Sequence, residues 1–225
     1  MITFSKVTKK FPLGNAALDD VSFVIEDNEF VFLVGPSGAG KTSIIKLILR
    51  DLLPSGGSVT VDDYNVSSKK FKNTQMLRRY IGVVFQDFKV LPEKNVFENI
   101  AISLKITNAS NNKINEEVES ALKLVNLNHK KRVFPSQLSA GELQRVAIAR
   151  AIIGDRKIIL ADEPTGNLDP KTSWEIMKIF AHLENKKTII FATHNTDIVN
   201  SMQKRVIVLS EGKITRDQKK GGYEA

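Results

Sequence analysis

The chain has 225 residues, enough for one large domain or two small ones. Its 42% hydrophobic and 26% charged residues are ordinary for a globular protein with a packed core. It has no cysteine, which excludes disulfides and thiolate metal sites, and no apolar run near the roughly 18 residues of a membrane span. Residues 1–6 lack the pattern of a secretory signal, so a cytoplasmic protein is expected.

The net charge of +8 comes from 33 Lys and Arg against 25 Asp and Glu. Short basic runs lie at 69–72, 130–132 and 219–220. Clustered cations bind nucleic acid through its phosphates, or the anionic inner face of a membrane at about 1 kcal/mol per basic residue. A lysine-rich solvated surface is the third interpretation, which we favour because the runs are short and scattered. We expect no nucleic acid and keep an anionic membrane surface as an alternative partner.

The first half of the chain predicts strands with one helix among them. Residues 21–25 alternate between core and solvent positions, as in a half-buried strand. Residues 30–34 are continuously apolar, which is typical of a strand buried on both faces of a parallel sheet. Glycines follow, then helical spacing over 42–49. A turn cluster at 54–57 and another strand at 81–85 complete this half.

The pattern becomes helical from about residue 93 to 138. Apolar positions over 96–104 and 118–125 each predict one helix face, and the polar stretch 108–112 predicts the loop between them. Further strands are predicted at 158–161 and 188–191.

The chain is expected to close with a hairpin over 205–215 that turns at 211–212. Residues 219–225 are expected to fray.

Residues 35–42 read Gly-Pro-Ser-Gly-Ala-Gly-Lys-Thr and match the phosphate-loop pattern in full, with a buried strand before them and a helix after them. Glycines let the backbone curl so that N–H groups and the helix N-terminus point at the β-phosphate. Lys41 then supplies a positive charge to the β- and γ-phosphates, and the Thr42 hydroxyl is expected to bind Mg²⁺. The residues expected to hold ATP here are Gly35, Ser37, Gly38, Ala39, Gly40, Lys41, Thr42 and Ser43.

Asp162 and Glu163 follow an apolar strand. Beside a phosphate-loop strand, Asp162 would hold Mg²⁺ through its water shell, and Glu163 would polarise the attacking water. Two acids at a strand end can also be a plain helix cap, an interpretation that the phosphate loop makes the weaker one.

Residues 138–145 read Leu-Ser-Ala-Gly-Glu-Leu-Gln-Arg. Ser139 and Gly141 open a helix there, with Glu142 placed for a capping box. About twenty residues before the acidic pair, this stretch resembles the Leu-Ser-Gly-Gly-Gln signature motif of the ATP-binding cassette (ABC) family. Ala140 departs from the motif by replacing a glycine, which questions the backbone angle there, and Glu142 replaces the usual glutamine.

Other ABC motifs follow in order along the whole chain, and their roles are what the resemblance implies. Gln86 matches the Q-loop glutamine, a ligand of Mg²⁺ and water, and residues 166–169 match the D-loop, which ends at Asp169. His194 matches the switch histidine at the γ-phosphate, and Phe11 the aromatic residue that stacks on adenine. A core position is the competing interpretation of Phe11. The other two histidines, His129 and His182, are expected on the surface.

The resemblance implies an α/β fold, the ABC nucleotide-binding domain. A P-loop NTPase core with a parallel sheet would combine with an N-terminal antiparallel β subdomain and an α-helical insertion. We assign the core and the antiparallel subdomain to 1–86 and 140–225, and the helical subdomain to 87–139. Two copies are expected to dimerise head to tail on binding ATP, each signature helix closing over the ATP of the other.

Within this family, residues 77–92 and 95–100 are similar to the FtsE family of bacterial cell-division ATPases, as are 173–177 and 192–195. That resemblance implies a peripheral protein on the cytoplasmic face of the membrane, whose closure moves the integral membrane partner FtsX and controls peptidoglycan hydrolases.

Cassettes that extract lipoproteins or export macrolides are the runner-up. They usually differ at the residue after Gln86, which is Asp87 here. Cassettes that act on ribosomes or DNA generally carry a second cassette or long insertions, which this chain lacks.

The segment after Gln86 is the expected docking site for the membrane partner. We expect Phe88 and Leu91 to be partly exposed and Val90 to be buried.

Overall fold

The computed structural model describes residues 1–12 and 16–223. Their contacts divide the chain into two compact units. The first unit joins Met1–Arg79 to Glu184–Ala225, and the second is Tyr80–Leu183. The assignment of residues 87–139 to a helical subdomain stays a prediction, because compactness does not test it.

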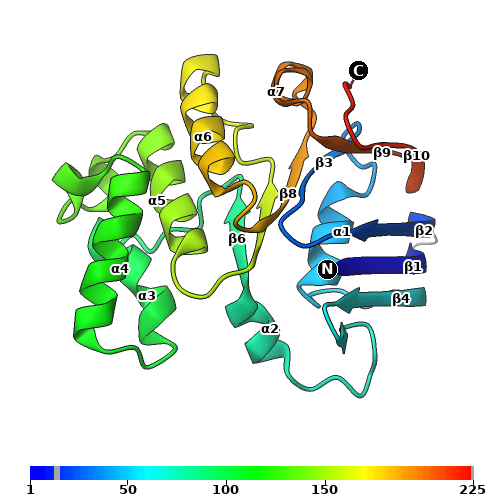
Figure 1. Ribbon diagram of the computed structural model, residues 1–225, viewed down its shortest axis with the longest axis horizontal. Coiled ribbons are helices and arrows are strands. Elements are labelled where there is room, and N and C mark those ends of the chain that lie inside the picture. Colours follow the sequence, from blue (N-terminus) through cyan, green and yellow to red (C-terminus); the bar gives the residue numbers. More distant parts are fainter. Residues whose placement is uncertain (13–15, 224–225) are drawn as a thin grey trace. The chain divides into compact units, whose positions relative to one another are not determined.

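The first unit contains an antiparallel sheet with the strand order β2-β1-β4-β5 (Figure 1). Its strands are β1 (Ile2–Lys10), β2 (Ala16–Ile25), β4 (Gly56–Val61) and β5 (Tyr64–Asn65). The predicted alternation is confirmed in β2, where Val21, Phe23 and Ile25 are buried. The turn predicted at 54–57 is wrong for its last two residues. They belong to β4, because Gly56 pairs with Thr8 of β1.

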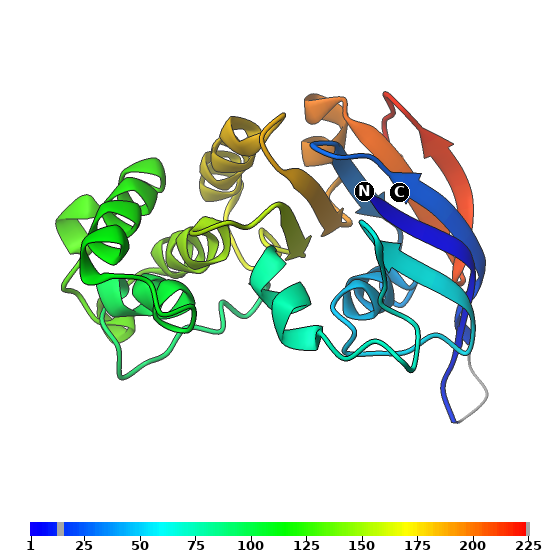
Figure 2. The same ribbon diagram turned by 60° about the horizontal axis from the view of Figure 1, so that its bottom comes forward.

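The other sheet of the first unit is mixed. The order there is β10-β9-β3-β8, in strands β3 (Phe30–Val34), β8 (Thr188–Thr193), β9 (Arg205–Ser210) and β10 (Lys213–Gln218). Strand β3 pairs in parallel with β8 and β9, and β10 is antiparallel to β9. Every residue of β3 and β8 is buried, which confirms the prediction from their apolar runs. Helix α1 (Lys41–Ile48) follows β3. The predicted hairpin is confirmed, and β2 lies beside its turn, where the Asp19 N–H donates to the Gly212 carbonyl at 2.9 Å (Figure 2).

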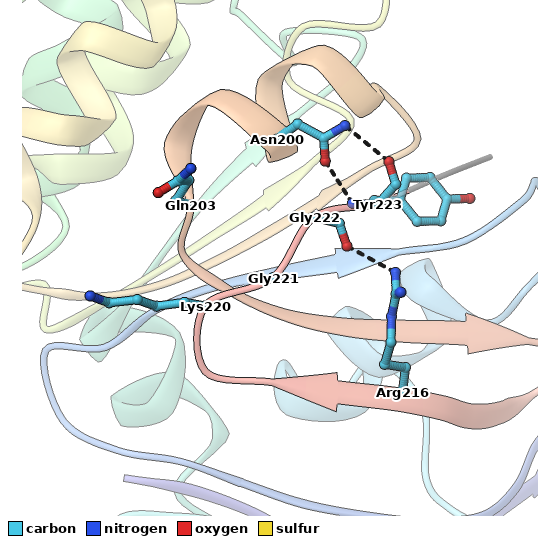
Figure 3. Close-up of a pocket in the computed structure, with 7 residues that line it drawn as sticks. All are labelled: Asn200, Gln203, Arg216, Lys220, Gly221, Gly222 and Tyr223. Carbon is cyan, nitrogen blue, oxygen red and sulfur yellow. Dashed lines mark hydrogen bonds between the residues drawn. The ribbon is translucent and has the colours of Figure 1, made fainter.

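Residues 221–223 of the C-terminal tail are held by hydrogen bonds, so the prediction of fraying is wrong for them; residues 224–225 lie outside the described ranges. Helix α7 (Thr196–Met202) holds the tail through Asn200. Its side chain accepts from the Tyr223 N–H at 2.7 Å and donates to the Tyr223 carbonyl at 3.2 Å (Figure 3). Arg216 donates to the Gly222 carbonyl at 2.8 Å. These groups line a cavity of about 520 Å³ that includes none of the predicted site residues.

The second unit pairs two parallel strands, β6 (Ile81–Phe85) and β7 (Ile158–Asp162). Four of its helices are α3 (Val96–Lys105), α4 (Asn111–Leu124), α5 (Ala140–Ile152) and α6 (Pro170–Leu183). Two short 3₁₀ helices span Asn128–Lys130 and Pro135–Gln137. Helix α2 (Thr74–Tyr80), which belongs to the first unit except for its last residue, precedes β6. In Figure 1 α3, α4 and α5 gather into one group.

Caps decide where these helices begin. Asn95 and Glu98 form a capping box at α3. Ser110 accepts from the Lys113 N–H and starts α4 at Asn111, so the predicted loop over 108–112 is two residues too long.

Helix α5, which begins with the signature residues, packs closely against β6. A Cβ at Gly82 of β6 would overlap the Ala151 carbonyl of α5, so only glycine lets the two elements approach so closely.

Within the described ranges, the longest apolar helices are too short to cross a membrane.

Candidate functional site

The phosphate loop follows β3 in a conformation that requires glycine. Gly35 and Gly40 have φ angles of 148° and 110°, in the region that side chains rarely tolerate. Neither position has room for a side chain, because a Cβ at Gly35 would overlap the Leu209 carbonyl and one at Gly40 would lie 2.6 Å from the Ala17 carbonyl. The glycine pattern therefore follows from the way the loop curls against its neighbours.

The Lys41 side chain lies along this loop. Only 7% of the residue is exposed, and its Nζ donates to the Gly35 carbonyl at 2.7 Å and the Pro36 carbonyl at 3.1 Å. Ser37 and Gly38 are exposed at the loop surface, whereas Ala39 is buried and its carbonyl accepts from the Gly212 N–H at 3.3 Å.

Helix α1 begins at Lys41 with Gly40 as its N-cap, so its first turn directs backbone N–H groups and the positive end of the helix dipole toward the loop. Thr42 is exposed and Ser43 half-buried on that turn. Curled loop, lysine and helix N-terminus together fit a phosphate group.

His194 directly follows β8, the strand that pairs with the strand leading into the phosphate loop. In the parallel pair β3–β8, Val34 lies opposite Thr193, so the loop and His194 start at the same edge of the first unit. Its side chain is exposed, and Asn195 caps α7 directly after it. In an open parallel sheet, ligands bind at the carboxyl ends of the strands.

Phe11 follows β1 and is 41% exposed. It is therefore not a core residue. The Lys9 ammonium lies 5.4 Å from the centre of its ring, a cation–π contact at the surface.

The second unit brings together the other strand-end residues. Phe85 of β6 lies opposite Asp162 of β7, so Gln86 and Glu163 are the next residues at one edge of this strand pair. Asp162 and Glu163 are half-buried, and Gln86 is exposed. The Gln86 amide donates to Asn167 Oδ1 at 3.1 Å, and Asn167 donates back to the Gln86 carbonyl at 3.4 Å. The predicted Q-loop and D-loop segments are thus hydrogen-bonded to each other.

Glu163 has a left-handed backbone, with a φ of 49°. Its carbonyl accepts from the Gly166 N–H at 3.1 Å, which closes a turn directly after β7. Non-glycine residues in this region carry strain of about 1–3 kcal/mol, and such residues cluster at functional sites.

Ser139 caps α5 in a complete capping box. Its Oγ accepts from the Glu142 N–H at 3.3 Å, and the Glu142 carboxylate accepts from the Ser139 N–H at 2.9 Å. Ala140 is the first residue of α5 and has the backbone of an ordinary helix, so no glycine is needed there. Lys130 forms an ion pair with Glu142 at 2.5 Å. Hydrogen bonds from Lys130 and then from the Ser139 N–H lower the pKa of Glu142 to about 2.

Gly141 lets α5 approach the start of α6. A Cβ at Gly141 would overlap the methyl group of Thr172. The Thr172 hydroxyl donates to Asp169 Oδ2 at 2.5 Å, and its N–H donates to Asp169 Oδ1 at 3.0 Å. These bonds, the hydroxyl's first, lower the pKa of Asp169. The Ser139–Gly141 turn is therefore linked through one threonine to Asp169.

The segment after Gln86 is strained and partly exposed. Phe88 and Lys89 have φ angles of 59° and 49°, and Arg150 fixes the segment by donating to the Phe88 carbonyl at 3.1 Å. Phe88 and Leu91 are half-buried, as expected. Val90 is also half-buried, so its expected burial is wrong.

Sequence reasoning included Asn167 in the D-loop but not its bond to Gln86, and it missed Thr172, Lys130 and Arg150, which hold predicted residues in place. Thr172 alone carried a signal, because its spacing of three from Asp169 is that of a helix cap.

The donors proposed for Mg²⁺ have suitable chemistry. Thr42 offers a hydroxyl, Gln86 an amide oxygen and Asp162 a carboxylate, the hard oxygen ligands that Mg²⁺ prefers. No group of three or more His, Asp or Glu side chains within the described ranges could hold a metal by itself. Mg²⁺ usually takes one or two direct protein ligands together with substrate phosphates and water, and Thr42 and Gln86 as direct ligands with Asp162 acting through water are donors of that kind.

Comparison with known proteins gives consistent results. The model of the ABC transporter family matches residues 18–166. The chain is 48% identical to the cell division ATP-binding protein FtsE of Bacillus subtilis over 99% of this chain and 98% of that protein. It is 43% identical to FtsE of Mycobacterium tuberculosis, with 99% and 98% covered, and 40% identical to FtsE of Escherichia coli, with 95% and 97% covered.

Solved structures agree on the fold. The dimeric structure of MJ0796, a bacterial ABC transporter cassette, has a TM-score of 0.89 at 34% identity, with 99% of this chain and 100% of that chain covered. A dimeric post-hydrolysis state of the same cassette, bound to ADP and Pi, has a TM-score of 0.89 at 33% identity, with the same coverage. The α/β fold with a parallel sheet and an antiparallel subdomain is that of an ABC cassette, as predicted. The chain therefore belongs to the ABC transporter family and is one of its ATP-hydrolysing cassettes.

Proposed function

We propose that this ATPase hydrolyses MgATP as the driving subunit of a membrane complex in bacterial cell division. The observation that carries the proposal is the similarity to FtsE proteins of three distant bacteria, at 40–48% identity over nearly the full length of both chains. Similarity of that extent supports a shared role as well as a shared fold.

Nucleotide binding is assigned to the first unit. Lys41 and the backbone of the curled loop bind the β- and γ-phosphates, and the exposed ring of Phe11 stacks on adenine. His194, at the same sheet edge as the loop, contacts the γ-phosphate.

Hydrolysis is assigned to the strand ends of the second unit. Glu163 polarises the attacking water, and Gln86 orients it from the neighbouring strand end. Thr42, Gln86 and Asp162 would hold Mg²⁺, which would supply positive charge to the phosphates. The hydrogen bond between Gln86 and Asn167 supports a coupling of the Q-loop to the D-loop, because a shift of one segment would displace the segment bonded to it.

The active form is a head-to-tail dimer formed on ATP binding. Ser139 and Gly141 at the start of α5 close over the nucleotide held by the partner copy, and Asp169 contacts the same interface. A capped helix N-terminus with an exposed serine suits a γ-phosphate, since its dipole and N–H groups face an anion.

The membrane partner is FtsX, and the protein acts at the cytoplasmic face of the membrane, where anionic lipids are an additional partner. Phe88 and Leu91 are the apolar anchors for a short cytoplasmic helix, in a segment that Arg150 holds in place.

Co-purification tests this assignment. The wild-type protein is tagged, isolated from solubilised membranes in its own host, and its partners are identified by mass. Recovery of FtsX supports the proposal. Recovery of a lipoprotein-extracting or macrolide-exporting permease in its place would favour the exporter role.

A further inference from the structure

Helix α5 carries a buried polar side chain that makes no hydrogen bond. Gln144 is fully shielded from solvent, and neither its Oε1 nor its Nε2 has a partner. The Nε atom of the next residue, Arg145, is buried without a partner as well, although its Nη1 donates to Glu175 at 2.8 Å. Within the described ranges, these three are the buried side-chain nitrogen and oxygen atoms that lack a hydrogen bond.

An apolar residue would be the more stable choice at this position. A glutamine amide offers two donors and an acceptor oxygen. Burying these groups without hydrogen bonds costs the hydration free energy that they had in water. Ile148, which follows Gln144 by one helical turn on the same face of α5, is buried and apolar. A buried polar group that is left unsatisfied in one arrangement is a candidate for a role in another.

Gln144 stands on α5 between two residues that contact α6, Gly141 and Arg145. One contact, Gly141 against Thr172, precedes it by a helical turn, and another, Arg145 with Glu175, follows it directly. The two contacts occur in the same order along both helices. Because Thr172 also holds Asp169, this junction connects the start of the signature helix to the D-loop.

We infer that Gln144 is a positioning residue that favours a second arrangement of α5 against α6. In that arrangement its amide gains hydrogen-bond partners, and Ser139 and Asp169 shift together into the geometry that hydrolysis requires. Packed helices exchange between discrete arrangements, and a group satisfied in only one of them biases the equilibrium toward that one. The inference rests on the roles proposed above for Ser139 and Asp169.

The test replaces the amide with an apolar side chain of similar length, Gln144→Met, in the full chain. Removing the unsatisfied groups should leave the melting temperature equal to that of the wild type or up to about 4 °C higher. The kcat for ATP should fall by about tenfold while the Kd for MgATP stays within about twofold. Ile148→Met, one turn further along α5 and equally buried, is the matched control and should keep kcat within about twofold.

The single tryptophan of the chain, Trp174, reports on α6 directly. It is 37% exposed and precedes Glu175, so its emission responds to a shift of α6. Addition of AMP-PNP with Mg²⁺ should change the emission of wild-type protein and leave that of Gln144→Met unchanged.

Three results would overturn the inference. They are a kcat of Gln144→Met equal to that of the wild type, a melting temperature several degrees lower, which indicates a purely structural amide, and an emission change that persists in the variant. Wild-type protein assayed in parallel distinguishes a failure of this inference from a failure of the proposed function. A wild type that does not hydrolyse ATP would contradict the proposed function itself.

Discussion

At the scale of single residues, the backbone of Glu163 is the feature most closely tied to chemistry. A left-handed φ of 49° at the end of β7 turns the chain away from the strand directly after Asp162. The two carboxylates are therefore separated by a sharp change of direction, which allows adjacent residues to serve different roles. In the proposed site one holds Mg²⁺ and the other acts on water.

Glu163→Gln tests that division of roles. The substitution preserves shape but removes the base, so kcat should fall by about 10²-fold or more while MgATP binding is retained. An ATP-bound dimer should then accumulate, visible by size-exclusion chromatography. The control is Asp197→Asn, which also replaces a carboxylate with a carboxamide, at an exposed position in the first turn of α7, and it should leave kcat unaltered. Hydrolysis by Glu163→Gln at the wild-type rate would show that the base is another group.

Glu142 makes stability depend on pH. Its pKa is lowered from 4.5 to about 2, so its contribution is present above pH 4.5 and is lost as pH falls toward 2. The free energy of unfolding of wild-type protein should therefore decrease between pH 5 and 2 by on the order of 1–2 kcal/mol more than that of Glu142→Gln. Urea titrations of both proteins across this range measure the difference. Parallel pH curves for the two proteins would refute the ion pair with Lys130.

At the scale of elements, the parallel strands β3, β6, β7 and β8 and the motif positions could be predicted from the sequence because one physical rule fixes each of them, whereas β1 and β5 are missing from the strands predicted above. β3 and β8 are apolar throughout since both faces are buried, and functional residues follow strand ends. The C-terminal tail could not be predicted, because its hydrogen bonds join Asn200 and Tyr223, which lie 23 residues apart. Lys130 belongs to a basic run read as solvated, yet it pairs with Glu142 on another helix. Local patterns carry no information about such tertiary partners.

The segment after Gln86 gives the second prediction at this scale. Phe88→Ala should weaken association with FtsX by at least tenfold, because a truncated apolar anchor costs about 2 kcal/mol or more. Basal ATPase activity should be preserved, since Arg150 bonds to the Phe88 carbonyl and not to its ring. Pull-downs with detergent-solubilised FtsX and ATPase assays on the same preparations measure both. Met76→Ala, an exposed apolar residue on α2, is the control. ATPase activity that falls in step with binding would assign Phe88 to the fold.

At the scale of the whole molecule, the proposed site is divided between two copies of the chain. Each copy contributes a phosphate loop to one nucleotide and a signature turn, Ser139–Gly141, to the other. Damage to either part should therefore be complemented by a partner copy damaged in the other part. A site contained within one copy would show no such complementation.

Mixing two inactive variants measures this directly. Lys41→Ala removes a phosphate contact and leaves the signature residues unchanged, and Ser139→Arg blocks the signature turn and leaves the residues of the phosphate loop unchanged. Each variant alone should therefore lose most ATPase activity. In a mixed dimer one of the two sites combines the intact loop of the Ser139→Arg copy with the intact signature of the Lys41→Ala copy. Random pairing makes half of the dimers mixed, so an equimolar mixture should recover up to about a quarter of the wild-type rate. ATPase activity that stays at the level of the separate variants at every mixing ratio would contradict a site shared between two copies.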